Sequence, residues 1–387
     1  RSIWVTGVQT CALPICIGEE IMALGDELIN VCTQETGLTA GRLQNERTRT
    51  INQCRLFAAL VREGSWLNAR IDTAQPGRTP LPKPDIRQMQ MPIGPVGVFG
   101  ASNFPLAFSV AGGDTVSALA AGCTVVVKAH PAHPSTSALV GKAIDRAARA
   151  TDMPDGVFSL IQGTTVETGM SIVTHPLIKA IGFTGSTKGG TTIAAAAAAR
   201  PEPIPVFAEM GSTNPVFILP GALREKTTAL ASGFAASATL GVGQFCTNPG
   251  LVVLIESAAA VDFLLKAGKS FEAVPAGIML TGRIKQSYDA GIEKLRHIEG
   301  VSVIAKGASS DNAFGGTARL LQANADAILA HAELTEEVFG PSSLTITAEN
   351  KEQVLHIAEN LSGHLTATIH ATADYMEIGR ASCRERV

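Results

Sequence analysis

The stretch Gly94-Pro95-Val96-Gly97-Val98-Phe99-Gly100 begins a regular alternation of strands and helices. Its apolar residues lie between glycines, which predicts a short buried strand. The next residues, Ala101-Ser102-Asn103-Phe104-Pro105, are expected to form the loop at the carboxyl end of that strand. The sequence therefore places Asn103 just beyond a buried strand.

The same alternation continues through the first half of the chain. Further strands are expected over residues 124–128, 157–161, 178–183 and 205–211. Helices are expected over residues 111–121, 137–150 and 167–174, and in a segment centred on residues 194–199. Such alternation predicts an α/β fold with a parallel, doubly wound sheet. Ligands bind beyond the carboxyl ends of the strands in these sheets, where the sequence places Asn103, Lys128, Gly163 and Ser186.

A second α/β series follows. Strands are expected over residues 215–219, 251–255, 301–305, 327–330 and 344–346, and helices over residues 227–240, 258–267 and 284–297. This series contains Gly241-Val242-Gly243-Gln244-Phe245-Cys246-Thr247-Asn248-Pro249-Gly250. A thiolate among such small, flexible residues can act as a nucleophile. Cys246 alone is a weak signal, because a lone cysteine is more often a small core residue.

The region before the first strand is expected to be helical. Apolar residues recur at three and four residues, one helix ends at Thr36-Gly37, and another covers residues 43–61. Residues 74–91 differ, because four prolines precede the alternating Arg87-Gln88-Met89-Gln90-Met91. This pattern predicts an exposed hairpin that pairs with another subunit, with an ordinary surface loop as the alternative.

The composition limits the class of protein. The 387 residues suggest two or three domains, and 45% hydrophobic against 17% charged residues indicates a compact globular protein. A net charge of −3 and 5% aromatic residues disfavour a nucleic-acid partner, and no apolar run reaches membrane-spanning length. Seven irregularly spaced cysteines give no disulfide framework and no zinc pattern, and the histidines form no metal set, so we expect no metal and a cytoplasmic location.

Four motifs occur in one order: Phe99-Gly100-Ala101-Ser102-Asn103-Phe104-Pro105-Leu106-Ala107-Phe108-Ser109, Lys128-Ala129-His130-Pro131-Ala132-His133-Pro134, Phe207-Ala208-Glu209-Met210, and Gly243-Gln244-Phe245-Cys246-Thr247-Asn248-Pro249-Gly250. With them the sequence resembles the aldehyde dehydrogenase superfamily across residues 17–376. The wording of the motifs is similar to that of the 2-oxoglutarate semialdehyde (2,5-dioxopentanoate) dehydrogenases. The resemblance implies a Rossmann-type parallel-sheet cofactor domain and an α/β catalytic domain.

The resemblance also implies catalytic roles. Cys246 would attack the aldehyde carbon, and the Asn103 amide with the Cys246 backbone N–H would form the oxyanion hole. Hydride would pass to the nicotinamide, and Glu209 would be the general base that hydrolyses the thioester. Read without the family, Asn103 is a turn former and Glu209 a satisfied carboxylate at a strand end.

Cofactor contacts follow from the same resemblance. Gly185 and Ser186 open a helix that can hold pyrophosphate, although the sequence has no G-x-G-x-x-G motif and a glycine-rich turn without phosphate is common. Glu337 would bind the nicotinamide ribose and Phe339 would flank the ring, although residues 336–341 by themselves predict a surface turn. Gly163 belongs to the same site. Lys128 would contact the adenosine ribose.

The choice of dinucleotide is expected from the loop after Lys128. NAD-preferring members often carry Glu three residues later, where this chain has Pro131 flanked by His130 and His133. Loss of that carboxylate removes repulsion of a 2′-phosphate, so we expect NADP to be preferred, with NAD possible.

The resemblance divides the chain into functional regions. Residues 17–73 and 92–211 would bind the cofactor, residues 74–91 would form an oligomerisation hairpin, and residues 212–376 would form a C-terminally incomplete catalytic domain. Residues 1–16 and 377–387 are expected to be non-native, because both ends resemble translated sequencing adapters. A signal peptide is the rejected alternative for the first of them.

The expected activity is NAD(P)-dependent oxidation of a small-molecule aldehyde, 2-oxoglutarate semialdehyde, to the acid, by a homodimer or homotetramer when full length. A broad or fatty-aldehyde dehydrogenase, a cysteine hydrolase or acyltransferase, and an inactive truncated fragment remain alternatives. A CoA-acylating relative is disfavoured, because thiolysis does not need the base Glu209.

Overall fold

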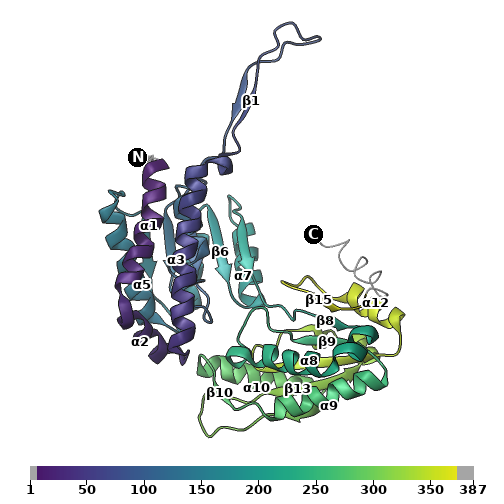
Figure 1. The fold of residues 1–387 in the computed structure, drawn as a ribbon. Coiled ribbons are helices and arrows are strands. Elements are labelled where there is room, and N and C mark those ends of the chain that lie inside the picture. The colour runs from purple at the N-terminus through teal and green to yellow at the C-terminus, as the bar shows by residue number, and fades with distance from the viewer. Residues whose placement is uncertain (1–6, 373–387) are drawn as a thin grey trace. The chain divides into compact units, whose positions relative to one another are not determined.

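The computed structural model describes residues 7–372, which form two compact units (Figure 1). The first unit ends at Met210 and the second begins at Gly211. Each unit has its own sheet and its own hydrophobic core.

The first unit is built on a five-stranded parallel sheet in the order β5-β4-β3-β6-β7. The strands are β3 (Val96–Phe99), β4 (Val125–Lys128), β5 (Phe158–Ile161), β6 (Ala180–Thr184) and β7 (Val206–Glu209). The chain runs outward from β3 to β5 and then returns to start again at β6. The direction of strand succession thus reverses between β3 and β6, and the expected doubly wound sheet is confirmed.

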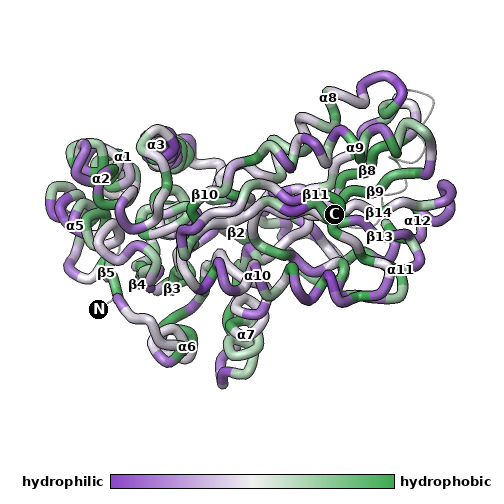
Figure 2. The backbone as a smooth tube through the Cα atoms, turned by 90° about the horizontal axis from the view of Figure 1, so that it is seen from below, coloured by the Kyte–Doolittle hydropathy of each residue, from purple (hydrophilic) through white to green (hydrophobic). Residues whose placement is uncertain are grey.

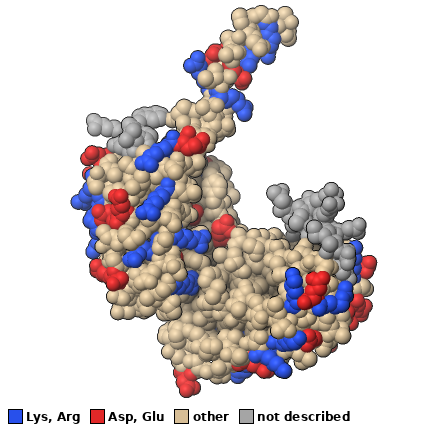
Figure 3. Space-filling model, in the orientation of Figure 1, with Lys and Arg blue, Asp and Glu red and all other residues tan. Residues whose placement is uncertain are grey.

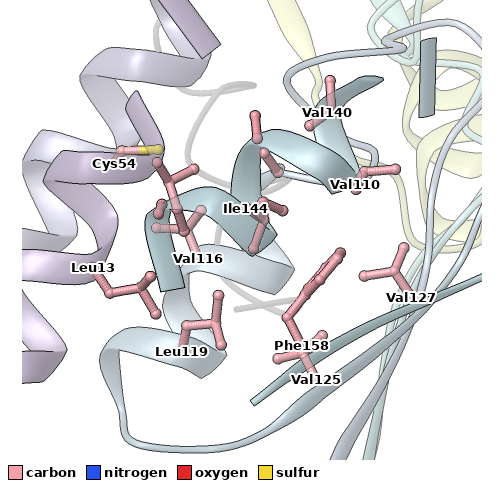
Figure 4. Packing of buried hydrophobic residues seen from close by; sticks show 14 of the residues in the cluster. Leu13, Cys54, Val110, Val116, Leu119, Val125, Val127, Val140, Ile144 and Phe158 are labelled. Carbon is pink, nitrogen blue, oxygen red and sulfur yellow. The ribbon is translucent and has the colours of Figure 1, made fainter. Parts of the chain in front are cut away.

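Helices cover both faces of this sheet. They are α1 (Gly7–Ala23), α2 (Gly25–Thr36), α3 (Ala40–Glu63), α4 (Gly113–Ala120), α5 (Pro134–Ala150), α6 (Val166–Thr174) and α7 (Thr187–Ala198). Because successive side chains of a strand point to opposite faces, Val125 and Val127 of β4 pack with α1, α3, α4 and α5, as Figure 4 shows for part of this cluster. Val126 points to the other face, where α6 and α7 lie. Gly97 of β3 has no room for a side chain, since an added Cβ would lie 2.7 Å from Ile172 of α6.

An antiparallel arm leaves the first unit between a short 3₁₀ turn, η1 (Ser65–Leu67), and β3. It consists of β1 (Arg70–Asp72) and β2 (Ile86–Gln88), and it extends away from α3 in Figure 1. Ile71 is 64% exposed and Ile86 is 50% exposed. The arm therefore presents apolar side chains that its own chain does not cover.

The second unit is built on a six-stranded sheet in the order β11-β13-β14-β9-β8-β15. The strands are β8 (Val216–Ile218), β9 (Leu251–Ile255), β11 (Ser302–Lys306), β13 (Arg319–Asn324), β14 (Ser342–Ala348) and β15 (Thr368–His370). Only β11 is antiparallel to its neighbour. A two-stranded ribbon, β10 (Gly277–Ile278) with β12 (Gly315–Gly316), completes the strands of this unit in the described residues.

Helices also sandwich the second sheet. One face packs on α8 (Pro220–Thr239) and α9 (Ala258–Glu272), and the other on α10 (Gly282–Arg296), α11 (Ala325–Ala330) and α12 (Lys351–Asn360). Two 3₁₀ turns, η2 (Leu240–Gly243) and η3 (Ala332–Thr335), precede the loops that lead into β9 and β14. Figure 2 shows hydrophobic colouring along β8 and β9 in the middle of this sandwich.

Several elements differ from the sequence expectation. The strand expected over residues 327–330 is instead part of α11, because the Asn324 side chain accepts the Ala327 N–H at 2.9 Å and caps a helix. The strand of this region is β13, which the sequence analysis missed. In the N-terminal region, Gly25 adopts φ +58 and separates α1 from α2, where one helix was expected.

The structure describes part of the first proposed non-native end and none of the second. Residues 7–16 form the first turns of α1, and Leu13 is fully buried in the core of the first unit. Residues 377–387 lie outside the described residues.

Candidate active site

The loop after β3 carries Asn103, which is 8% exposed. Helix α3 holds this loop at two points. The Arg42 guanidinium donates to the Asn103 main-chain oxygen at 2.5 Å, and the buried Glu46 accepts the N–H groups of Leu106 and Ala107 at 2.8 and 3.0 Å. Arg42 and Glu46 are supports that the sequence analysis missed, because they lie about 60 residues earlier in the chain.

Other predicted residues share the same edge of the first sheet. Lys128 is the last residue of β4 and pairs with Phe99, the last residue of β3. Glu209 ends β7, Ser186 follows β6 and Gly163 follows β5. Five predicted residues therefore lie at the carboxyl ends of parallel strands, where doubly wound sheets bind ligands. They are Asn103, Lys128, Gly163, Ser186 and Glu209.

Burial lowers the pKa of Lys128. Near Glu209, the pKa of Asp114 is raised, first by desolvation and second by the charge of Glu209. Asp114 lies at the start of α4, and its Oδ2 would be 2.9 Å from a Cβ on Gly182, so only glycine leaves room for it there. Asp114 as a whole is exposed, although its carboxyl group lies against Gly182. No motif in the sequence marks Asp114 as a second carboxylate of this edge.

Ser186 caps the N-terminus of α7, where its hydroxyl oxygen accepts the Gly189 N–H at 3.2 Å. Side chains are excluded around it, since a Cβ on Gly185 would lie 2.7 Å from the Phe183 ring. The first two residues of α7, Thr187 and Lys188, are exposed. An exposed helix start of this kind fits a pyrophosphate group.

The two histidines of the loop after β4 differ. His130 is partly buried, and its Nδ1 accepts the Ala132 N–H at 3.1 Å. His133 is fully buried, with Nε2 3.0 Å from the Ala101 oxygen, and burial lowers its pKa. Of the two histidines near Pro131, His133 therefore points into the protein, where its ring supports the loop of Asn103.

In the second unit, Cys246 lies on the loop between η2 and β9 and is partly exposed. The described cysteines form no disulfide. The loop enters through Gly241, Val242 and Gly243, which all have positive φ. The Asn214 side chain donates to the Cys246 main-chain oxygen at 2.8 Å. The cysteine therefore sits on an unusual but well-tethered backbone.

Glu337 and Phe339 belong to the loop that joins η3 to β14, and they line a pocket with Gly243, Asn248 and Ser212. Desolvation raises the pKa of Glu337 to about 7, although a hydrogen bond from the Ser212 N–H opposes the shift. The loops of Cys246 and Glu337 are joined, because Asn248 donates to the Gly340 oxygen at 3.2 Å.

Asn214 is the residue of this unit that the sequence analysis missed. It directly precedes Pro215, the first residue of the strand expected over residues 215–219. Asparagine tolerates positive φ, and here φ is +46. That tolerance is the one feature of the sequence that could have singled out Asn214.

In the described residues no group of three or more His, Cys, Asp or Glu could hold a metal ion.

Known proteins resemble this chain in both sequence and structure. The sequence profile of the aldehyde dehydrogenase family matches residues 16–384. Alpha-ketoglutaric semialdehyde dehydrogenase 2 of Azospirillum brasilense is 51% identical over 94% of this chain and 69% of its own length. Alpha-ketoglutaric semialdehyde dehydrogenase of Acinetobacter baylyi is 46% identical over 92% of this chain and 67% of its own length.

Solved structures share the fold. A NAD-dependent benzaldehyde dehydrogenase from Corynebacterium glutamicum matches with a TM-score of 0.80 and 24% identity, over 97% of this chain and 80% of that one. Glyceraldehyde-3-phosphate dehydrogenase GapN from Methanocaldococcus jannaschii, complexed with NADP, matches with a TM-score of 0.79 and 20% identity, over 97% and 79% of the two chains. Over residues 7–372, no helix combines the length and the apolar character needed to cross a membrane.

Proposed function

Because this chain belongs to the aldehyde dehydrogenase family and is an NAD(P)-dependent aldehyde dehydrogenase, we propose that its substrate is alpha-ketoglutaric (2-oxoglutaric) semialdehyde, oxidised to 2-oxoglutarate. Two relatives with that activity in their names, at 51% and 46% identity, support the choice of substrate. The observation that carries the chemistry is the tethered loop of Cys246, which is joined to the loop of Glu337 and Phe339.

We propose that the Cys246 thiolate forms a C–S bond to the aldehyde carbon. The oxygen becomes negative, and the Asn103 amide and the Cys246 N–H donate to it. Loss of hydride from that carbon leaves a thioester on Cys246, and NAD(P), when bound, supplies the hydride acceptor. Glu209 then takes a proton from water, which adds to the thioester carbon and releases the acid with cleavage of the C–S bond.

The proposed cofactor residues divide between the two units. In the first, the start of α7 at Gly185 and Ser186 would hold the pyrophosphate, and Lys128, His130 and Gly163 would contact the adenosine half. In the second, Glu337 would accept the nicotinamide-ribose hydroxyls and Phe339 would flank the ring. The exposed start of α7 and the pocket lined by Glu337 and Phe339 support these assignments. The absence of a carboxylate at Pro131 supports NADP over NAD.

The remaining proposals concern organisation. We assign residues 17–73 and 92–211 to cofactor binding and residues 212–376 to catalysis, which is supported by the division at Met210. The apolar, exposed arm supports a role for residues 74–91 in a homodimer or homotetramer. The described cysteines form no disulfide, which supports a cytoplasmic location. The face drawn in Figure 3 mixes both signs of charge and shows no broad basic patch, which supports a small-molecule partner over a nucleic acid.

The experiment is aldehyde-dependent reduction of NAD(P), followed by absorbance, with identification of 2-oxoglutarate as the product. Cys246→Ser should abolish turnover, because serine lacks the acidity of the thiol. Cys16→Ser, a partly exposed cysteine of α1, is the matched control and should retain activity. Near-normal turnover by Cys246→Ser would overturn the mechanism. Higher catalytic efficiency with a fatty aldehyde would overturn the substrate, and product release without NAD(P) would indicate a cysteine hydrolase.

A further inference from the structure

We propose that Asn214 is the positioning residue of Cys246, a role that rests on the proposed function of this cysteine as the nucleophile. Asn214 lies 32 residues before Cys246, in the segment that leads into β8. It is 3% exposed. Its side chain spans the space between this segment and the cysteine loop, so it can fix the main chain that carries the thiol.

The nitrogen end of the Asn214 amide faces the cysteine loop. Nδ2 donates to the main-chain oxygens of Cys246 and Asn248, both at 2.8 Å. An amide NH₂ group has two hydrogens, and these two short bonds use both of them, while the Ser212 main-chain oxygen lies farther from Nδ2, at 3.3 Å. Fixing the Cys246 carbonyl fixes the peptide plane on its carboxyl side, and this limits the directions that the Cα–Cβ bond can take.

The oxygen end of the amide is held from the opposite side. Oδ1 accepts from the Ser212 hydroxyl at 2.9 Å, and from the Thr366 hydroxyl and N–H at 3.0 and 3.3 Å. The orientation of the amide is decided by its partners, because a backbone N–H can only donate and a carbonyl can only accept. Asn214 therefore connects the strand region of Thr366 to the loop of Cys246 through one rigid planar group.

The main chain around Asn214 adds to this rigidity. Its φ of +46 is tolerated by asparagine, and Pro215 follows. The neighbouring Thr213 oxygen accepts the Gly250 N–H at 2.8 Å, so the far end of the cysteine loop is tied to the same segment. Both ends of residues 246–250 thus depend on residues 213–214.

The decisive variant is Asn214→Asp. It keeps the size, the tolerance of positive φ and the Oδ1 acceptor, but it places an oxygen against the two carbonyls in place of the donating nitrogen. Asn350→Asp is the matched control, since Asn350 caps α12 with its side-chain oxygen and aspartate caps equally well. If Asn214→Asp does not fold by circular dichroism, Asn214→Gly replaces it, because glycine adopts the same φ and lacks the amide.

Two readouts test the proposal on the full chain. The first is the rate at which iodoacetamide alkylates Cys246, read by mass spectrometry of the peptide that contains it, as a function of pH. We expect the rate to fall about 10- to 100-fold, in line with the cost of displacing a reacting group by about 1 Å. The second is kcat, which should fall by a similar factor while KM and the Kd for NAD(P) change less than about threefold.

An alkylation rate and a kcat within about twofold of the parent in the folded variant would overturn the proposal. So would a lower kcat with an unchanged alkylation rate and pH profile, because the thiol would then be correctly placed without Asn214. Alkylation does not require dehydrogenase activity. A parent chain that is alkylated but oxidises no aldehyde would therefore count against the proposed function alone, and the Asn214 comparison would still be decided.

Discussion

A Cβ atom on Gly243 would lie 2.1 Å from the main-chain oxygen of Gly340, so the two backbones touch with no room for a side chain. Gly243 opens the loop of Cys246, and Gly340 ends the loop of Glu337 and Phe339. This contact fixes the distance between the proposed nucleophile and the proposed nicotinamide site within one unit.

Gly243→Ala should therefore impair both loops. The added methyl group meets backbone atoms, which cannot rotate away, and φ at this position is +64. We expect a large loss of kcat and a Tm lower by several degrees, measured by turnover and calorimetry. Gly233→Ala is the control, because an added Cβ meets nothing within 4 Å on the exposed side of α8, and it should stabilise the chain by about 0.5–1 kcal/mol. Parent-like activity in Gly243→Ala would contradict the role of this contact.

Glu209→Gln should separate hydride release from hydrolysis. The substitution leaves the main-chain hydrogen bond in place, because it is the main-chain oxygen of residue 209 that accepts the Gly185 N–H, at 3.0 Å. We expect a single burst of NAD(P)H followed by a slow steady state, seen by stopped-flow absorbance, because the thioester accumulates without its base. Glu202→Gln, an exposed partner of Lys179, should behave like the parent. Loss of the burst itself would mean that Glu209 acts earlier, for example on Cys246.

Glu337 should make stability depend on pH. Its pKa rises from 4.5 in the unfolded chain to about 7 in the folded one, so the folded state binds the proton more tightly. This contribution to stability is complete below the unfolded pKa and is lost as pH rises through about 7. The amide side chain of Glu337→Gln has no proton to lose, so the variant does not lose stability in this pH range. We expect its Tm, relative to the parent, to be higher at about pH 8 than at about pH 4 by about 2–4 °C.

Calorimetry at the two pH values measures this difference. The control is Glu336→Gln, whose carboxylate is exposed and pairs with Lys294 at the surface. It should show no comparable change in relative Tm. A relative Tm of Glu337→Gln that does not vary with pH would show that the carboxyl is not desolvated.

Lys128→Ala should lower the preference for NADP. Lys128 ends β4 at the ligand-binding edge of the sheet, and the next residues offer Pro131 where a carboxylate would repel a 2′-phosphate. We expect the parent to have the higher kcat/KM with NADP, and the ratio of the two efficiencies to fall towards NAD in the variant. Lys142→Ala, on the exposed side of α5, should leave the ratio unchanged. A parent that prefers NAD, or a ratio that does not respond to Lys128→Ala, would refute this reading.

The sequence by itself determined the type and order of most elements. Short apolar runs such as Val125–Lys128 alternate with helical segments, and that local pattern suffices to predict parallel strands. It also placed Asn103, Lys128, Ser186 and Glu209 at strand ends, because the end of an apolar run is visible in the sequence. The sequence prediction was wrong at residues 327–330, because a short apolar run does not distinguish a strand from a helix. The Asn324 cap favours the helix that the structure has there.

The tertiary structure decided which distant groups support the site. Arg42 and Glu46 reach the loop of Asn103, and Asn214 reaches Cys246, across separations of more than 30 residues. It also buried His133 against the Ala101 oxygen, where the ring supports the loop of Asn103. Hydrogen bonds of this kind depend on where folded segments meet in space, and hydrophobic periodicity, which records only the buried face of each element, carries no information about that meeting.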